Sequence, residues 1–142
     1  MPHSLVTAIP PAHSAVAAEH FAGRLALETD CSDVHEAMRS GPADFVLLDV
    51  RGPNAYARSH VLGALNLPHR EITAERMASW PADTLFVVYC AGPHCNGADK
   101  GALRLARLGR PVKLMIGGLT GWADEGFRFA EGTEPGRLSE AA

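Results

Sequence analysis

A cysteine stands where an apolar run of strand length gives way to a helical pattern. Cys90 follows the run 84–89, and a short glycine-containing loop leads from it into a helix that begins near Asn96. The backbone N–H groups of such a loop and the positive end of a helix dipole stabilise an anion. They lower the pKa of a thiol and favour a thiolate nucleophile. Cys90 is therefore the candidate catalytic residue, provided that the other elements position it.

A second cysteine lies in the same loop, five residues after Cys90. The plainer expectation for Cys95 is a small apolar or exposed side chain. The alternative is a resolving thiol, which converts a persulfide or sulfenate on Cys90 into a disulfide if the two Cα atoms lie within about 7 Å. Zinc held by Cys90, His94 and Cys95, with His60 or His69, fits poorly, because structural zinc sites use ligand pairs at C-x-x-C or H-x-x-x-H spacing. We expect no metal.

The elements that must position Cys90 form a regular alternation. The runs 45–50, 84–89 and 112–116 are apolar and of strand length, as in strands covered on both faces of a parallel sheet. Strands that alternate with helices at this spacing indicate an α/β fold. The intervening helical patterns lie at 53–58, 71–79 and 96–108.

In a parallel sheet, ligands bind beyond the carboxyl ends of the strands. Asp49 and Arg51 close the first run, Cys90 the second, and the Gly117-Gly118 turn follows the third. These residues are therefore expected at one edge, with Asp49 and Arg51 as supporting residues that anchor neighbouring loops. His60 is expected to bond the backbone of a turn rather than to act as a base.

Helix 96–108 carries a basic stripe of Lys100, Arg104 and Arg107 at steps of four and three residues. The stripe is a solvated face or, alternatively, steers acidic partners and anionic donors. The opposite face is expected to pack on the sheet, and its residues are Ala98, Ala102, Leu105 and Ala106.

Residues outside this pattern set the domain bounds. Residues 1–12 hold three prolines without periodicity and are expected to form a flexible arm. A helical pattern runs over 13–23, and the helix is expected either to pack on the sheet or to make a homodimer contact. Residues 25–28 alternate like a short strand. Residues 13–130 are the expected domain, and 131–142 a flexible tail.

Composition limits the function classes. The net charge of −3 excludes a general nucleic-acid binder, which needs an excess of Lys and Arg. No run of eighteen apolar residues is present, so no membrane partner is expected, and residues 1–11 lack the Lys and Arg of a signal peptide. Three cysteines do not form a disulfide framework, which favours a cytoplasmic location.

Four segments in sequence order carry a resemblance. They are Asp49-Val50-Arg51, His60-Val61-Leu62-Gly63-Ala64, Cys90, and Gly117-Gly118-Leu119-Thr120-Gly121-Trp122. Over about Ala26 to Phe129 the chain resembles the single-domain rhodaneses, which are sulfurtransferases. The resemblance implies a five-stranded, mostly parallel sheet flanked by helices on both faces, and no cofactor. It also implies that Cys90 takes a sulfane sulfur from thiosulfate or a persulfide, and passes it as a persulfide to a thiol or cyanide.

The implied substrate cradle is the loop after the nucleophile, made of Ala91, Gly92, Pro93, His94, Cys95, Asn96 and Gly97. Many family members carry an Arg in the later half of this loop, where this chain has Cys95-Asn96. His69 or Arg70 could replace it. The missing Arg disfavours the phosphatase and arsenate-reductase chemistry of related proteins. The alternative function is a non-catalytic rhodanese-fold module that binds a partner or senses redox state through Cys90 and Cys95.

Overall fold

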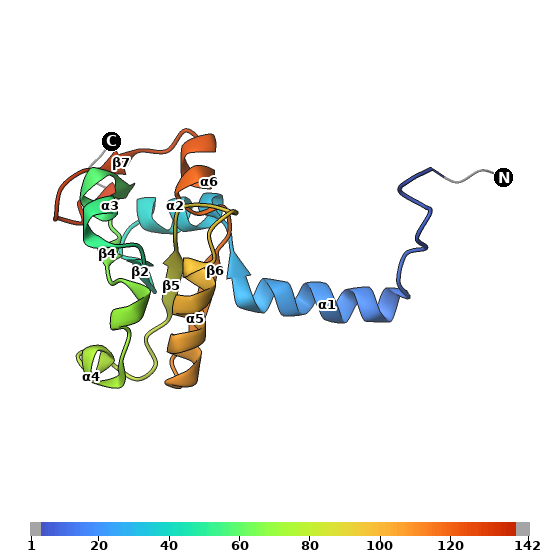
Figure 1. Cartoon of the computed structure of the whole chain (residues 1–142), viewed down its shortest axis with the longest axis horizontal. Helices are drawn as coiled ribbons and strands as arrows, with labels where there is room; N and C mark the ends of the chain where they lie inside the picture. The colour runs from blue at the N-terminus through green and yellow to red at the C-terminus, as the bar shows by residue number, and fades with distance from the viewer. Residues whose placement is uncertain (1–3, 139–142) are drawn as a thin grey trace.

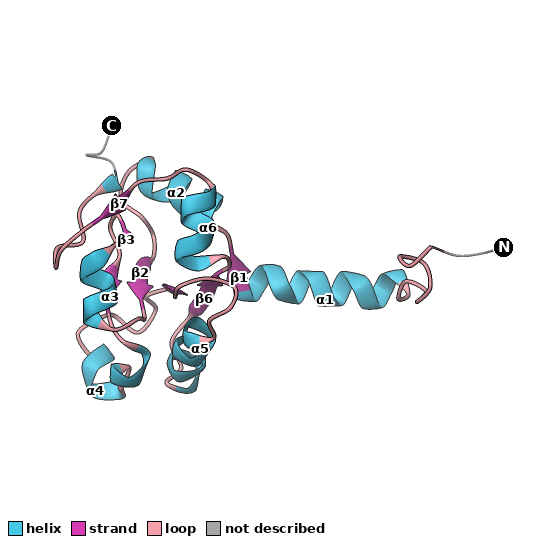
Figure 2. Ribbon diagram, turned by 45° about the horizontal axis from the view of Figure 1, so that its top comes forward, coloured by secondary structure: helices cyan, strands magenta, loops and turns pink. Residues whose placement is uncertain are grey.

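Five strands form a sheet in the order β1 (Glu28–Thr29), β6 (Val112–Met115), β5 (Phe86–Tyr89), β2 (Val46–Asp49) and β4 (Leu65–Asn66), and every neighbouring pair is parallel. A separate antiparallel ribbon joins β3 and β7 (Figure 2). The computed structural model describes residues 4–138. Its elements are α1 (Ser14–Leu27), β1 (Glu28–Thr29), α2 (Cys31–Arg39), β2 (Val46–Asp49), α3 (Pro53–Arg58), β3 (His60–Val61), β4 (Leu65–Asn66), the 3₁₀ helix η1 (His69–Glu71), α4 (Ala74–Met77), β5 (Phe86–Tyr89), α5 (Gly97–Arg107), β6 (Val112–Met115), α6 (Gly118–Asp124) and β7 (Phe129–Ala130).

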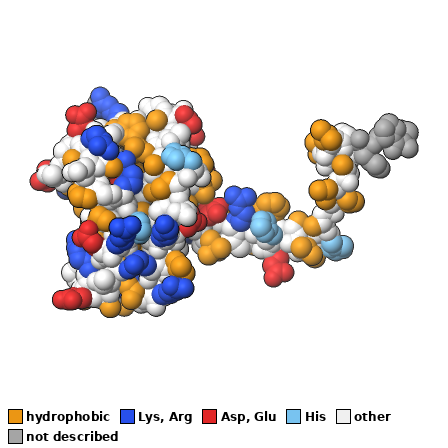
Figure 3. Space-filling view, viewed as in Figure 1, with side chains coloured by type: hydrophobic (Ala, Val, Ile, Leu, Met, Phe, Trp, Pro, Cys, Tyr) orange, Lys and Arg blue, Asp and Glu red, His pale blue; other side chains and the backbone are white. Residues whose placement is uncertain are grey.

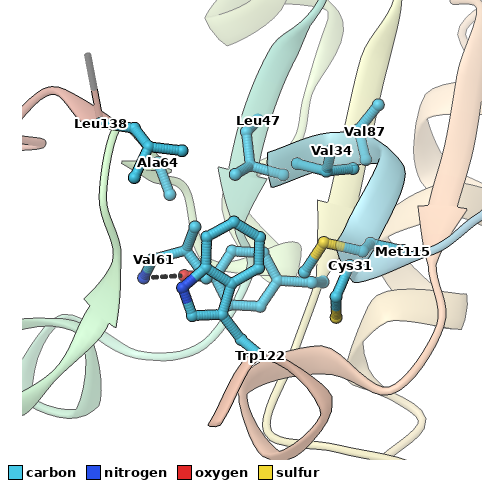
Figure 4. Close-up of a cluster of buried hydrophobic side chains, with 10 residues drawn as sticks. Cys31, Val34, Leu47, Val61, Ala64, Val87, Met115, Trp122 and Leu138 are labelled. Atoms are coloured by element: carbon cyan, nitrogen blue, oxygen red, sulfur yellow. Dashed lines mark hydrogen bonds between the residues drawn. The ribbon is translucent and has the colours of Figure 1, made fainter. Parts of the chain in front are cut away.

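The central strand β5 is buried on both faces, as its unbroken apolar run predicts. Because side chains alternate along a strand, Val87 and Tyr89 point into one core cluster and Phe86, Val88 and Cys90 into the other. The first cluster packs the sheet against α2 and α6, with Trp122 at its centre (Figure 4). The second packs it against α4 and α5. The expected layers of helix, sheet and helix are thus present.

The local sequence sets the start of two of the helices. Asp30 caps α2 by accepting a hydrogen bond from the Asp33 N–H, and Pro53 begins α3. Helix α5 buries Ala98, Gly101 and Leu105, whereas Ala106, expected on the packed face, is exposed. Gly101 replaces it in the interface because its bare Cα lies against Val50.

One helix prediction and one strand prediction were wrong. The pattern over 71–79 predicted one helix, but the structure has η1, then a buried Ile72 and a new start at Thr73, whose side chain caps the four-residue α4. The pattern over 25–28 predicted a strand, yet α1 continues to Leu27 and β1 holds two residues. Leu25 and Leu27 are both exposed, so their alternation does not reflect a half-buried strand.

Helix α1 projects from the edge of the sheet, and only its C-terminal end touches the domain (Figure 1). The Nζ of Lys113 on β6 donates a hydrogen bond to the Leu25 carbonyl at 3.0 Å. Arg24 and Glu28 form an ion pair of 3.2 Å at the junction with β1. Neither contact buries any residue of α1.

Residues 131–138, expected to belong to a flexible tail, make contacts that tie them to the domain. The Gly132 N–H bonds the Ala57 carbonyl at 2.7 Å, and the Gly63 N–H bonds the Pro135 carbonyl at 2.8 Å. Leu138 is buried in the cluster of Figure 4. The remaining residues of the expected tail, 139–142, lie outside the described part of the chain, as do residues 1–3 of the expected arm.

Candidate functional site

Cys90 lies directly after β5, at the carboxyl edge of the sheet, with its side chain 3% exposed. The start of α6 holds this point in place. The N–H groups of Leu119 and Thr120 donate to the carbonyl oxygens of Cys90 and Ala91, each at 3.0 Å. The Thr120 hydroxyl donates to the Ala91 carbonyl as well, also at 3.0 Å. Thr120 is thus a positioning residue that sequence reasoning missed, although it lies within a segment that carries the family resemblance.

Gly118 explains why the two segments approach so closely. Its φ of +54° lies in the left-handed region, and a Cβ there would collide with the Cys90 carbonyl oxygen and stand 3.0 Å from the Gly92 nitrogen. A residue with a side chain would push the Cys90 loop away from α6.

The loop folds back so that its two thiols lie together. A turn centred on Pro93 and His94 is closed by a 3.0 Å hydrogen bond from the Cys95 N–H to the Gly92 carbonyl. The Cys90 thiol donates to the Cys95 carbonyl oxygen, with Sγ and O 3.2 Å apart. The Gly97 N–H donates to the Cys95 Sγ at 3.4 Å.

The electrostatics of the two thiols run in opposite directions. Burial is the main cause that raises the pKa of Cys90 above its ordinary value, and a hydrogen bond with the Cys95 side chain raises it further, against the N–H groups of Ala98 and Gly92. The pKa of Cys95 is lowered, chiefly by the Gly97 N–H, with help from the charge of Lys100. The expected lowering of the Cys90 pKa is therefore wrong for this state of the loop, because burial outweighs the N–H groups.

The backbone N–H groups of the predicted substrate cradle are shared between the sulfurs of Cys90 and Cys95. The N–H groups of Gly92 and Ala98 act on Cys90, and those of Ala91 and Gly97 act on Cys95. The Cys95 N–H is used within the turn. Ala98, one residue beyond the predicted range 91–97, belongs to the cradle because it lies in the first turn of α5.

The loop faces an open hollow of about 580 Å³. Cys95 lines this hollow, whereas Cys90 does not. Its lining residues are Ala91, Pro93, His94, Cys95, Asn96 and Asp99. The side chain with a formal charge among them is the Asp99 carboxylate. The cations Lys100 and Arg104 lie farther along α5, where Arg104 reaches the Arg70 carbonyl at 3.5 Å.

Asp49 and Arg51 form a supporting pair beneath the loops. The Asp49 carboxylate is fully buried and accepts three hydrogen bonds from the Arg51 side chain, at 2.7, 3.0 and 3.2 Å. It accepts another from the Tyr89 hydroxyl at 2.8 Å. Burial lowers the pKa of Arg51, but its bonds to Asp49 outweigh that effect and leave it raised. Arg51 also donates to the Ser59 carbonyl at 2.6 Å, so the pair ties three segments together.

The other candidate residues are structural. His60 is buried, and its two ring nitrogens face the carbonyl oxygens of Tyr56 and Glu134 at 2.8 and 2.9 Å, as expected for a histidine that bonds backbone. Cys31 is buried against α6, where burial raises its pKa to about 11. Within residues 4–138, no three His, Cys, Asp or Glu side chains are placed to hold a metal ion. No helix in this same range is long and apolar enough to cross a membrane.

A rhodanese-type fold and a strand-end cysteine define the class of this protein. The chain belongs to the rhodanese-like domain family, whose match covers residues 30–125. It is 34% identical over 135 residues to the HTH-type transcriptional regulator Rv0324 of Mycobacterium tuberculosis. That match covers 94% of this chain and 59% of the regulator, so the chain spans little more than half of its length.

Solved structures agree with this assignment. The BH2092 protein of Bacillus halodurans has a TM-score of 0.80 at 33% identity, over 85% of this chain and 88% of that one. A thiosulfate sulfurtransferase of Pseudomonas aeruginosa shares the fold, with a TM-score of 0.65 at 24% identity, over 78% of this chain and 21% of its own. The family resemblance and the five-stranded α/β fold predicted from the sequence are confirmed.

Proposed function

We propose that this protein is a rhodanese-type sulfurtransferase and that Cys90 carries the sulfur. The Cys90 thiolate attacks the outer sulfur of a donor, the donor's S–S bond breaks, and sulfite or a thiolate leaves with the electron pair. An acceptor thiolate or cyanide then attacks the outer sulfur of the Cys90 persulfide and releases the Cys90 thiolate. The observation that carries the proposal is the position of Cys90 at the carboxyl end of β5 and beside the start of α5, where the N–H groups of Gly92 and Ala98 act to lower the pKa of its thiol against the effect of burial.

The charge of the hollow favours a persulfide donor over thiosulfate. Asp99 lines the hollow, and no Lys or Arg among residues 4–138 does. A carboxylate repels the thiosulfate dianion more strongly than a persulfide of lower charge. The donor class we propose is accordingly a low-molecular-weight or protein persulfide, and the acceptor a thiol.

The second candidate function is a sulfur- or redox-sensing module, favoured by the match to a transcriptional regulator over most of this chain. In that function the state of Cys90 and Cys95 is read by a partner or by another part of a longer protein. Both functions suit a reducing cytoplasm, because all three cysteines are free thiols.

Mass spectrometry after incubation with cysteine persulfide, which carries less negative charge than thiosulfate, tests the proposal. We expect an adduct of about 32 Da, the mass of one sulfur, on Cys90. Cys90→Ser should abolish it, whereas Cys31→Ser, at a buried thiol on the other face of the sheet, should not. Turnover with an acceptor thiol distinguishes the enzyme from the sensing module. Absence of an adduct with persulfide and thiosulfate alike would overturn both the enzyme and persulfide sensing.

A further inference from the structure

The proposed transfer uses one thiol, yet the loop presents two. A Cβ placed on Gly97 would lie 3.4 Å from the Cys95 Sγ and 3.8 Å from the Cys90 Sγ, so both sulfurs adjoin the same point. Gly97 leaves this space open because it has no side chain. The Cys90 thiol also donates to the Cys95 carbonyl oxygen at 3.2 Å, so it faces the residue that carries the second thiol.

The two thiols differ in access and in charge state. Cys90 is almost completely covered, while Cys95 is half-buried and lines the hollow. The N–H groups and the nearby Lys100 lower the pKa of Cys95, which makes it the more readily ionised of the two. A thiolate beside a sulfur that carries a sulfane atom is placed for thiol–disulfide exchange.

We propose that Cys95 is the resolving nucleophile of the Cys90 persulfide. This inference rests on the proposed function, since it needs a persulfide on Cys90. The Cys95 thiolate supplies the electron pair for a new bond to the Cys90 Sγ. The bond between that Sγ and the outer sulfur breaks, and the outer sulfur leaves with its electron pair as hydrosulfide. No further oxidant is needed, because the sulfane sulfur is itself reduced as the two thiols become a disulfide.

The consequence is a branch point at Cys90. When an acceptor thiol is abundant, it takes the outer sulfur and both cysteines stay reduced. When acceptor is scarce, the intramolecular attack of Cys95 wins, and the loop rests as a Cys90–Cys95 disulfide until a dithiol reduces it. The pair thus converts a surplus of persulfide donor into a lasting change of the loop.

The test follows the persulfide over time after excess donor is removed, in the wild type and in Cys95→Ser and Cys95→Ala. In the wild type we expect the adduct to decay to a species about 2 Da below the reduced chain, with one hydrosulfide released per chain. In both variants the adduct of about 32 Da should persist at least ten times longer. Cys31→Ser is the matched control and should decay like the wild type.

The outcomes separate this inference from the proposed function. A Cys90 persulfide that is equally stable in the wild type and both variants would overturn the role of Cys95 and leave sulfur transfer standing. An adduct that moves intact onto Cys95 would also overturn resolution, because the outer sulfur would then be the atom attacked. If neither the wild type nor either variant ever forms an adduct, the proposed function itself fails. If only the wild type forms one, Cys95 is needed for loading and the resolving role is overturned.

A different observation concerns α1, whose apolar face has no cover. The helix has an apolar stripe of Ala18, Phe21, Ala22 and Leu25 at helical spacing, and Phe21 and Leu25 are 55% and 74% exposed. Figure 3 shows apolar side chains along this arm, away from the body of the domain. An isolated helix of fourteen residues is marginal in water, so burial of this stripe against a partner would stabilise it.

The sequence of α1 is self-complementary in one arrangement. In an antiparallel pair centred between Phe21 and Ala22, Phe21 lies opposite the partner's Ala22 and Leu25 lies opposite the partner's Ala18. Each large side chain thereby meets a small one.

We infer that α1 pairs with α1 of a second copy of this chain. Sedimentation equilibrium is the test, at micromolar concentrations and with the chain as printed. We expect the wild type to dimerise and Phe21→Glu to be monomeric, because the variant sets a carboxylate against the partner's apolar stripe. Leu103→Glu, at an exposed leucine of α5, is the matched control and should dimerise like the wild type. A monomeric wild type, or a dimer unchanged by Phe21→Glu, would overturn the inference.

Discussion

The hydroxyl of Tyr89 lies between two segments that meet at the carboxyl edge of the sheet. It donates to the Asp49 carboxylate at 2.8 Å and accepts from the Val61 N–H at 3.0 Å, the bond drawn in Figure 4. Tyr89 is the residue directly before Cys90. The hydroxyl therefore joins the strand that carries the nucleophile to the ion pair of Asp49 and Arg51.

Tyr89→Phe removes this link without changing the volume of the ring. It leaves a fully buried carboxylate and a buried N–H each short of one partner, so we expect a loss of about 2–3 kcal/mol in the free energy of unfolding. Urea denaturation measures it. The comparison is Tyr56→Phe, which removes a bond to the Ala64 carbonyl and should cost about 1 kcal/mol. Equal losses in the two variants would argue against a special role for the carboxylate.

Gly118→Ala should disable the loop rather than only strain the backbone. The new Cβ collides with the Cys90 carbonyl, so the loop must leave α6, and we expect persulfide formation to fall at least tenfold. Gly126 also has a positive φ, of +79°, but open space around its Cα. Gly126→Ala should therefore cost about 1 kcal/mol of stability and leave persulfide formation unchanged. The rate of adduct formation in both variants, with circular dichroism to verify folding, decides the matter.

The opposed pKa shifts of the loop thiols predict the pH dependence of alkylation. At neutral pH Cys95 should react with iodoacetamide before Cys90, because its pKa is lowered and it lines the hollow. Cys90 alkylation should rise with pH through the alkaline range, since burial raises its pKa. Cys95→Ala should shift the Cys90 profile to lower pH, because the hydrogen bond that helps to hold the Cys90 pKa up is gone.

Peptide mass spectrometry across a pH series gives both profiles separately. If Cys90 reacts first at neutral pH, a donor-free loop must hold the two thiols differently from the geometry described above. A Cys90 profile that stays in place in Cys95→Ala would mean that burial alone sets it.

The sequence predicts this site unevenly. The strand-end position of Cys90 could be predicted because an unbroken apolar run defines a doubly covered strand, and such strands end at the ligand-binding edge. The division of N–H groups between Cys90 and Cys95 could not, because it depends on how the turn at Pro93 folds. The ribbon of β3 and β7 was missed because its strands hold two residues each, too few for any periodicity.

Asp99 should set donor preference. Removing its charge in Asp99→Asn takes a carboxylate out of the hollow, so we expect the KM for thiosulfate to fall several-fold while that for a persulfide of lower charge changes little. Asp44→Asn, at an exposed position before β2, controls for the change in net charge. The effect should shrink in high salt, because exposed charges are screened. An equal change for both donors would assign Asp99 to folding of the loop instead.

We expect the buried thiol of Cys31 to make the protein less stable in alkaline solution. Its folded pKa is raised from 9.0 to about 11, chiefly by burial, so its contribution is complete below pH 9 and is lost as pH rises to about 11. This pKa shift corresponds to a loss of about 2–3 kcal/mol in the free energy of unfolding. The pKa of Tyr56 is raised to about 12 from 10.0, so the stability that Tyr56 contributes begins to be lost about one pH unit higher.

In a chain with both loop cysteines changed to Ser, denaturation at pH 8, 9 and 10 should give a falling free energy of unfolding. Cys31→Ala in that background should have a lower free energy of unfolding at pH 8, because the substitution leaves a cavity. That free energy should stay level between pH 8 and 9.5. A parallel fall in the two chains would show that another group titrates in this range.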